Sequence, residues 1–239
     1  MTHTLSKQIY PGQILAQKYE VVSHVGSADE GELYMLEERE TGIERTAKFF
    51  NPATNKGNRN AKYLARKLHK LRHCNVLMQY RTQETIEVNK TPVTFMVSDF
   101  REGEPLRDFL ASHAGKKLTV FEGLHLLHAI AVGVEPMHRM NEYHGNVEID
   151  NILIRRRGIS YQIKLMDLHN NGASRPELIK NDIIDMIRIL YNALGGSKTY
   201  SKHPQVIKDI MCGLRKSLIK ERFKNAGTLR AHLESIHWN

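Results

Sequence analysis

Hydrophobic positions change their period along the chain, and the change divides it into two parts. Residues 19–50 contain short runs of β-branched and aromatic residues separated by Gly-containing or charged turns, which predicts an antiparallel three-stranded meander. Residues 85–100 predict a hairpin with its turn at Asn89-Lys90. Between them, residues 58–72 have apolar residues three and four positions apart, which predicts one helix.

The carboxyl-terminal part has the period of helices. Apolar residues recur at helical intervals over 106–113, 120–140, 182–194 and 206–218. A hairpin is predicted over 151–168, between the second and third of these helices. We therefore predict an α+β fold in four segments, which are an extension (1–18), a β-rich part with one helix (19–98), a hinge (99–105) and a mainly helical part (106–239).

Composition favours an ordinary globular protein. Apolar residues make up 41% and charged residues 26% of the 239 positions. The two cysteines, Cys74 and Cys212, are far apart and outside any CxxC spacing, so neither a disulfide framework nor a zinc site is indicated. The first twenty residues lack the apolar run of a signal peptide, and no stretch of eighteen apolar residues occurs. We expect a cytoplasmic protein that does not enter a membrane.

The net charge of +9 is concentrated in one segment. Residues 45–81 contain ten Lys or Arg, and no acidic residue lies between Glu44 and Glu84. The simplest interpretation is a solvated basic helix face, and the alternative is a surface for an acidic protein partner. Nucleic-acid binding is disfavoured, because the aromatic residues Phe50, Tyr63 and Tyr80 have the spacing of packed elements rather than of a stacking platform.

Several residues with possible chemistry follow one another in a fixed order. Gly26 and Gly31 bound a turn, Lys48 lies on a strand, His144 is followed by Asn151, and Asp167 ends a strand. Each signal alone is weak, since such residues also serve ordinary turns and strands. In this order, from about Tyr19 to the carboxyl end, they resemble the protein kinase superfamily, in which a Gly-rich loop, a lysine and metal-holding Asp and Asn residues bind ATP.

The resemblance implies a minimal two-lobed kinase-like fold and a set of nucleotide contacts. GSADEGEL (26–33) resembles the Gly-rich loop, RTAKFF resembles the VAIK strand, and MVSDFREGEPL resembles the hinge, with Ser98 as gatekeeper and the 99–101 backbone near adenine. The implied nucleotide-binding residues are Gly26, Ala28, Gly31, Leu33, Thr46, Lys48, Ser98, Asp99, Phe100 and Leu153.

The resemblance also implies metal ligands and structural residues. HGNVEIDN resembles HRDLKPEN, and MDLHN resembles the stretch that contains DFG, so Asn151 and Asp167 match the two magnesium ligands and ATP with Mg²⁺ is the expected cofactor pair. His144 braces the loop, and a helix begins at a buried Asp182. The ERF motif resembles the family's closing segment, in which Arg222 would pair with Glu177.

The departures from the family pattern fall on the chemistry. Asn146 stands where an aspartate acts as general base, and general-base assistance typically supplies about 10²–10⁴ in rate, or about 3–5 kcal/mol. Glu148 replaces a lysine, and acidic residues occupy the loop tip at Asp29 and Glu30. The 58–72 helix has no carboxylate for Lys48 and places Leu64 at that site.

Two hypotheses follow. The first is a pseudokinase with impaired or absent phosphotransfer, which binds ATP and Mg²⁺ and acts as a regulatory or scaffolding module. The alternative is a weakly active, atypical Ser/Thr kinase or a small-molecule phosphotransferase. The short activation segment (168–174) fits a small acceptor, whereas Asn146 and Glu148 argue against efficient transfer.

Overall fold

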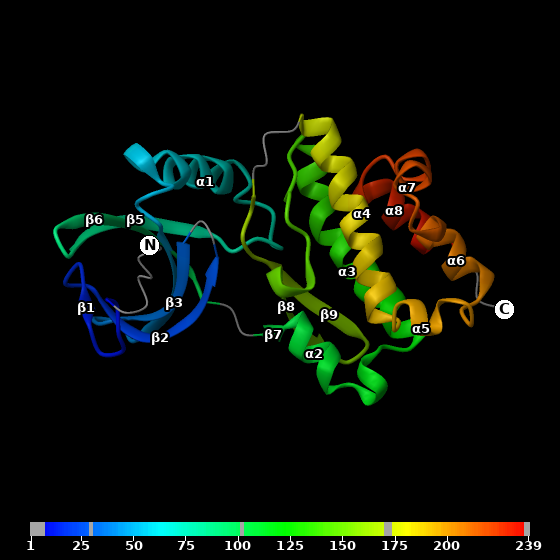
Figure 1. Cartoon of the computed structure of the whole chain (residues 1–239), viewed down its shortest axis with the longest axis horizontal. Coiled ribbons are helices and arrows are strands. Elements are labelled where there is room, and N and C mark those ends of the chain that lie inside the picture. The colour runs from blue at the N-terminus through cyan, green and yellow to red at the C-terminus, as the bar shows by residue number, and fades with distance from the viewer. Residues whose placement is uncertain (1–7, 29–30, 101–102, 170–173, 237–239) are drawn as a thin grey trace. The chain divides into compact units, whose positions relative to one another are not determined.

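The computed structural model describes residues 8–28, 31–100, 103–169 and 174–236 (Figure 1). The chain forms two units. The first contains Met1–His73 and Met78–Arg101, and the second contains Cys74–Leu77 and Glu102–Asn239. The predicted loop tip (Asp29, Glu30), the hinge residue Arg101 and most of the activation segment (170–173) lie outside the residues that the structure describes.

The first unit is built on a six-stranded antiparallel sheet of order β1-β2-β3-β4-β6-β5. The strands are β1 (Ile14–Leu15), β2 (Tyr19–Ala28), β3 (Gly31–Glu38), β4 (Ile43–Phe50), β5 (Tyr80–Val88) and β6 (Thr91–Asp99). The predicted meander and hairpin are both present. Asn89 and Lys90 have φ of 49° and 64°, and two successive positive φ values are typical of a type I′ hairpin turn.

One face of this sheet forms the core of the first unit. Alternate residues point to it because successive side chains of a strand lie on opposite faces, as for Tyr34, Phe49 and Phe95. The Phe49 and Phe95 rings stack at 4.6 Å between centroids. Residues 8–18, which the sequence set apart as an extension, add Ile9 and Leu15 to this core, because β1 pairs with β2.

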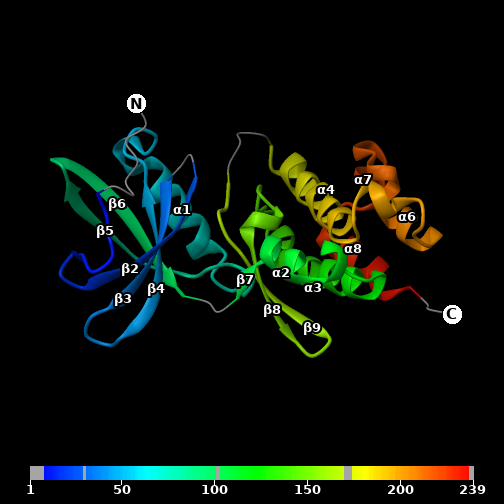
Figure 2. The same cartoon turned by 60° about the horizontal axis from the view of Figure 1, so that its bottom comes forward.

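Helix α1 (Arg59–Lys70) packs beside the sheet, as Figure 2 shows. Its start is fixed by Asn55, whose Oδ1 accepts from Asn60 N (3.1 Å) and Ala61 N (3.2 Å). Thr94 of β6 donates to Asn58 Oδ1 over 2.8 Å, just before the helix. The predicted 58–72 helix is therefore confirmed within two residues at each end.

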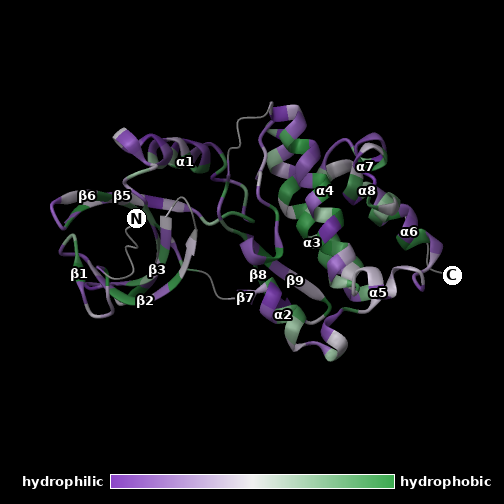
Figure 3. Cartoon of the chain, viewed as in Figure 1, coloured by the Kyte–Doolittle hydropathy of each residue, from purple (hydrophilic) through white to green (hydrophobic). Residues whose placement is uncertain are grey.

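In the second unit, α3 (Val120–Arg139) packs against α4 (Arg175–Ala193), α8 and β9. Both long helices carry apolar residues, green in Figure 3, along much of their length. The other elements are β7 (Glu104–Pro105), α2 (Leu106–Ser112), η3 (Ala114–Lys116), η4 (Ile149–Asn151), β8 (Ile152–Arg157), β9 (Ser160–Leu165), α5 (Ser197–Tyr200), α6 (Gln205–Met211), η5 (Cys212–Leu214), α7 (Lys216–Arg222) and α8 (Ala226–Glu234). The predicted 151–168 hairpin is β8–β9.

The segment Cys74–Leu77 belongs to the second unit, although the sequence placed it in the β-rich part. Leu165 N donates to Val76 O over 2.7 Å, and Leu77 forms a parallel bridge with Leu165. The side chain of Val76 also packs where Gly133 of α3 leaves room, since a Cβ there would lie 2.6 Å from Val76 Cγ2.

Two predicted helices differ from the structure. The helix expected to begin at Asp182 begins at Arg175, because Pro176 is accepted in a first helical turn, and Asp182 lies inside it. The single helix predicted over 206–218 is wrong. Residues 212–214 have φ of 49°, 59° and 58°, which ends α6 at Met211, and α7 begins at Lys216.

No helix within the described part of the chain is both long and apolar enough to cross a membrane.

Candidate functional site

A buried carboxylate organises the loop between α3 and β8. Asp182 of α4 has no solvent exposure, and its side chain accepts from His144 N (2.7 Å), Gly145 N (2.8 Å) and His138 Nε2 (3.1 Å). These three donors supply the hydrogen bonds that a buried carboxylate needs. Asp182 is thus buried, and it holds the loop through the backbone N–H groups of His144 and Gly145.

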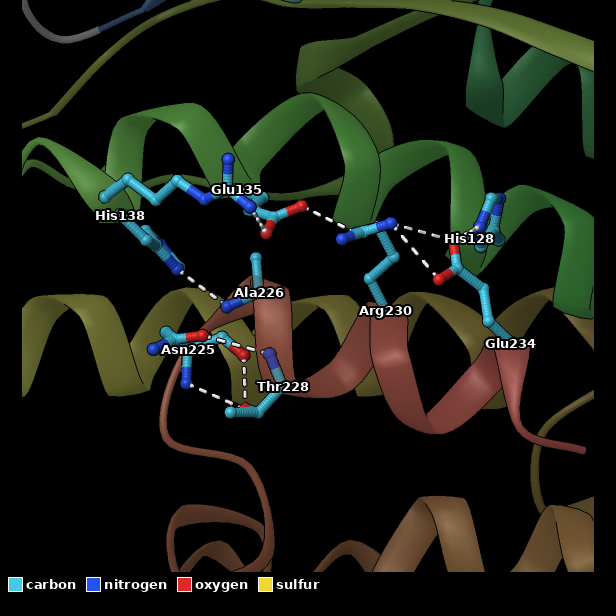
Figure 4. A network of polar contacts seen from close by, with 9 residues as sticks. His128, Glu135, His138, Asn225, Ala226, Thr228, Arg230 and Glu234 are labelled. Carbon is cyan, nitrogen blue, oxygen red and sulfur yellow. Dashed lines mark hydrogen bonds and ion pairs between the residues drawn. The ribbon is translucent and has the colours of Figure 1, made fainter.

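His138 connects Asp182 to the last helix, and Figure 4 shows its bond to Ala226 of that helix. Ala226 N donates to His138 Nδ1 over 3.0 Å, so the ring accepts at Nδ1 and donates to Asp182 from Nε2. Asn225 caps α8, and Arg230 of α8 lies 2.6 Å from Glu135 of α3. The amino-terminal end of α8 is thus linked through one imidazole to the carboxylate that holds the loop of His144 and Gly145.

Gly145 is required by a close backbone approach. Its φ is +83°, and a Cβ at this position would lie 2.5 Å from His169 O. His169 N donates to His144 O over 3.0 Å, so the loop runs against the backbone that follows β9. The Gly in HGN therefore has a structural cause, because a side chain here would meet backbone.

The loop brings Asn146, Asn151 and Asp167 together. Asn146 Nδ2 donates to Asp167 Oδ2 (3.2 Å), and Asn151 Nδ2 donates to Asn146 O (3.3 Å). Met166 N donates to Asn151 O over 2.8 Å, which joins the residue before Asp167 to the same loop. Asp167 has φ of +58°, which is uncommon for a residue with a side chain. The predicted catalytic position and both predicted metal ligands thus form one cluster.

The donor set suits a hard cation that brings further ligands. The Asp167 carboxylate and the Asn151 amide are oxygen donors, and Mg²⁺ in proteins usually takes one or two carboxylates together with substrate phosphates and water. Among the residues described, no group of three or more His, Cys, Asp or Glu could hold a metal alone. These residues therefore fit Mg²⁺ delivered with a phosphate.

In the first unit, four of the predicted nucleotide contacts share the sheet face opposite the core. Leu33 of β3 pairs with Lys48 of β4. Thr46 pairs with Ser98 of β6 in the next row on that face, and both are largely buried. Lys48 Nζ lies 5.8 Å from the centre of the Phe50 ring. The β-pairing alone thus places Leu33, Thr46, Lys48 and Ser98 on one surface.

The predicted Gly-rich loop is a hairpin end. Gly26 pairs with Leu33, and Ala28 pairs with Gly31. Gly31 has φ of +157°, and a Cβ there would lie 1.9 Å from Phe49 O, so this glycine allows β4 to approach β3.

Asp99 makes contacts that the sequence did not indicate. Its carboxylate accepts two bonds of 2.8 Å from Arg81 and one of 2.9 Å from Arg45. This bidentate geometry is typical of Arg with a carboxylate.

Phe100, the next predicted contact, is half-buried. In the second unit, Leu153 on β8 is also half-buried.

Helix α1 buries a lysine, Lys67, three residues after Leu64, which stands at the family's carboxylate position. Its buried residues are Ala61, Leu64, Lys67 and Leu68. The burial of Lys67 was not predicted, although its position three residues after Leu64 and four after Tyr63 puts it on the apolar face.

The expected Glu177–Arg222 pair is wrong. Glu177 pairs with Lys220, which lowers the pKa of the Glu177 carboxyl, chiefly through the hydrogen bond from Lys220. Arg222, the last residue of α7, lies over the Phe223 ring and 3.5 Å from His232 Nε2. Lys220 and Arg222 are two residues apart and so lie on different sides of the helix.

Comparison with known proteins identifies the fold. The model of the protein tyrosine and serine/threonine kinase family matches residues 20–174. A double mutant of the Mycobacterium tuberculosis PknI kinase domain shares 14% identity at a TM-score of 0.66, over 95% of this chain and 96% of that chain. Rad53 in complex with AMP-PNP shares 19% identity at a TM-score of 0.67, over 90% of this chain and 60% of that chain. No curated protein sequence matches the chain.

Proposed function

The chain belongs to the protein tyrosine and serine/threonine kinase family, and on this premise we propose that it is a pseudokinase. In this proposal it holds ATP and Mg²⁺, transfers phosphate poorly or not at all, and acts as a regulatory or scaffolding module. Asn151 and Asp167 would hold the metal, and Lys48 would contact the nucleotide phosphates.

The observation that carries the proposal is the bond between Asn146 and Asp167. In an active kinase the residue at this loop position accepts the proton of the substrate hydroxyl. The Asn146 side chain instead donates to Asp167 Oδ2 over 3.2 Å. An amide does not act as a base near neutral pH, and the loss of a general base costs about 10²–10⁴ in rate. In this proposal, the Asn146–Asp167 bond orients Asp167 as a metal ligand.

The backbone of Asp167 supports a retained binding role. Its φ of +58° lies in a region that costs roughly 1–3 kcal/mol for a residue with a side chain. Such conformations persist where the surrounding structure holds them, and they cluster at functional sites. A loop that had lost every ligand would gain stability by relaxing this residue or by replacing it with glycine.

Charge near the loop opposes transfer. Glu148 is exposed, two residues after Asn146, where the family pattern has a lysine. A negative side chain there disfavours the negative charge that spreads over the transferred phosphoryl group. In this proposal, the protein therefore binds a nucleotide but transfers its phosphate poorly or not at all.

Thermal denaturation with ATP and Mg²⁺ tests the binding part. We expect the melting temperature of the unaltered protein to rise, because a ligand that binds only the folded state stabilises it. The rise should disappear in Lys48→Ala and Asp167→Ala and persist in Lys198→Ala, a control at an exposed position of the second unit. The absence of a rise in the unaltered protein would leave only a scaffolding role.

Transfer of radiolabelled phosphate tests the catalytic part. We expect rates far below the roughly 1–100 s⁻¹ that is typical of kinases. A rate in that range, abolished by Asp167→Ala, would overturn the proposal and identify an active enzyme. The choice between a protein acceptor and a small-molecule acceptor would then follow from the labelled product.

A further inference from the structure

The structure sorts the basic run of residues 45–81 by environment. Arg45 and Arg81 are engaged by Asp99, Lys67 is buried, and Lys48 lies on the sheet face opposite the core. The remaining basic residues are exposed and lie on α1 or directly beside it: Lys56, Arg59, Lys62, Arg66, Lys70 and Arg72.

Four of these residues form one row along α1, which we call the α1 row: Arg59, Lys62, Arg66 and Lys70. Their spacing of three, four and four residues places them on one face of the helix, over about 16 Å. Ala61, Leu64 and Leu68 are turned the other way and buried, and the helix contains no acidic residue.

The α1 row destabilises its own helix. Like charges three or four residues apart repel, and positive charges in a first turn oppose the helix dipole. Within the described part of the chain, Arg59, Lys62 and Arg66 form no ion pair with a carboxylate, and Lys62 Nζ donates only to Gly57 O. A partner that supplies negative charge would remove this repulsion.

We propose that the α1 row binds an acidic segment of a partner polypeptide. Its charges recur every 4.5–6 Å along the helix axis, by the rise of about 1.5 Å per residue. This matches carboxylates three or four residues apart on a partner helix, or on alternate residues of a strand at about 6.6 Å. The guanidinium groups of Arg59 and Arg66 suit bidentate contacts with carboxylates.

The same face is poorly suited to other polyanions. A helix that lies on a membrane inserts several apolar side chains, but the aliphatic residues Leu64 and Leu68 of α1 are buried. Single-stranded nucleic acid needs stacking rings, and Tyr63, 37% exposed, is the one aromatic residue of α1.

The face of β5 that leads to the start of α1 also carries an acidic residue, which disfavours a broad polyanion. Thr85 of β5 contacts Thr94, which contacts Asn58 at the start of α1. Glu87, two residues after Thr85 on that face of β5, is exposed.

Fluorescence anisotropy with a labelled twelve-residue peptide of alternating Glu and Ser tests this proposal. The test variant carries Arg59→Glu, Lys62→Glu and Arg66→Glu, and the control carries Lys198→Glu, Lys202→Glu and Lys216→Glu at exposed positions of the second unit. We expect the test variant to lose at least about tenfold in affinity and the control to stay within about twofold, because exposed charges act over about one Debye length. Equal loss in both variants would overturn the proposal.

Two further measurements separate this surface from folding and from the nucleotide site. The test variant should melt at the same temperature as the unaltered protein or higher, since carboxylates suit the first turn of a helix and the carboxylate at position 66 would lie four residues before Lys70. Its temperature rise with ATP and Mg²⁺ should equal that of the unaltered protein, so failure of either proposal is seen independently. Tighter binding of a twelve-base oligonucleotide or of phosphatidylserine vesicles than of the peptide would also overturn the proposal.

Discussion

Asn146 donates its side-chain amide to Asp167 Oδ2 over 3.2 Å, so the residue at the predicted catalytic position contacts the residue at the predicted metal position. In a catalytically competent loop both positions carry carboxylates, which repel each other unless a cation lies between them. The amide removes this repulsion. The loop of this protein therefore holds the Asp167 side chain through an uncharged partner.

Asn146→Asp should make the stability of the protein depend on a divalent cation. The substitution puts a second carboxylate about 3 Å from the first, and we expect it to lower the free energy of unfolding by about 1–3 kcal/mol in the presence of a chelator. Saturating Mg²⁺ should restore most of the loss. Urea denaturation with and without Mg²⁺ measures both values.

The control for this prediction is Asn192→Asp on the exposed side of α4, which changes the net charge equally. Equal effects of the two substitutions, or a loss that Mg²⁺ does not reduce, would contradict the prediction.

Gly145→Ala should be costly because it combines a positive φ with a backbone contact. We expect a loss of about 2–4 kcal/mol in the free energy of unfolding, of which the left-handed backbone alone accounts for about 1–2 kcal/mol. Gly158→Ala is the matched control, since Gly158 has φ of +60° and no atom within 4 Å of an added Cβ. A similar cost at both sites would show that the contact with His169 O adds nothing.

Much of the fold could be predicted because the hydrophobic pattern is local. The kinase-like α+β fold expected from the sequence is confirmed, and so are the β2–β4 meander and the β5–β6 hairpin. The alternation of apolar residues predicts the strands, and the Asn89-Lys90 turn predicts that two of them form a hairpin.

The errors share a different cause. The apolar period continues through residues 206–218, and nothing in it shows that Cys212 and Leu214 adopt left-handed backbone. Likewise, Ile9 and Leu15 gave no strand-length signal, since β1 has two residues and is held by its pairing with β2. Tertiary contacts decide such short segments, and local propensity does not report them.

The candidate site shows the same division. The order of the motifs along the chain predicted that Asn146, Asn151 and Asp167 belong to one site. In the structure, Asn146 contacts both Asp167 and Asn151. The existence of the Asn146–Asp167 bond could not be predicted, because it depends on the left-handed backbone of Asp167 and on the turn at Gly145.

Lys220, rather than Arg222, should control the titration of Glu177. The hydrogen bond from Lys220 lowers the pKa of this carboxyl, so stability from the pair is present above the unfolded pKa and is lost as pH falls through the folded one. We expect Lys220→Met to raise the pKa of Glu177 and Arg222→Met to leave it unchanged. Carbon-detected NMR titration of the Glu177 carboxyl measures the difference, and an equal response to both substitutions would restore the Glu177–Arg222 pair.

Asp185 should make the protein less stable as pH rises. Burial, with smaller contributions from Asp182 and Glu148, raises its pKa from 3.8 to about 6, and Arg188 at 3.3 Å opposes the rise. The folded protein therefore binds more protons at this residue than the unfolded chain between about pH 4 and 6. The contribution of Asp185 to stability falls through that window and is level above it.

Asp185→Asn should abolish that fall, because an amide does not ionise. Relative to the unaltered protein, we expect the variant to gain on the order of 1–3 kcal/mol in unfolding free energy at pH 7 compared with pH 4. Arg188→Met should act in the opposite sense, since losing the guanidinium raises the pKa of Asp185 further and extends the window upward. Urea denaturation of the three proteins at both pH values measures these differences. If Asp185→Asn changed stability equally at pH 4 and pH 7, the pKa of Asp185 would be the same in the folded and unfolded protein, and the surroundings of this carboxyl would carry no electrostatic cost.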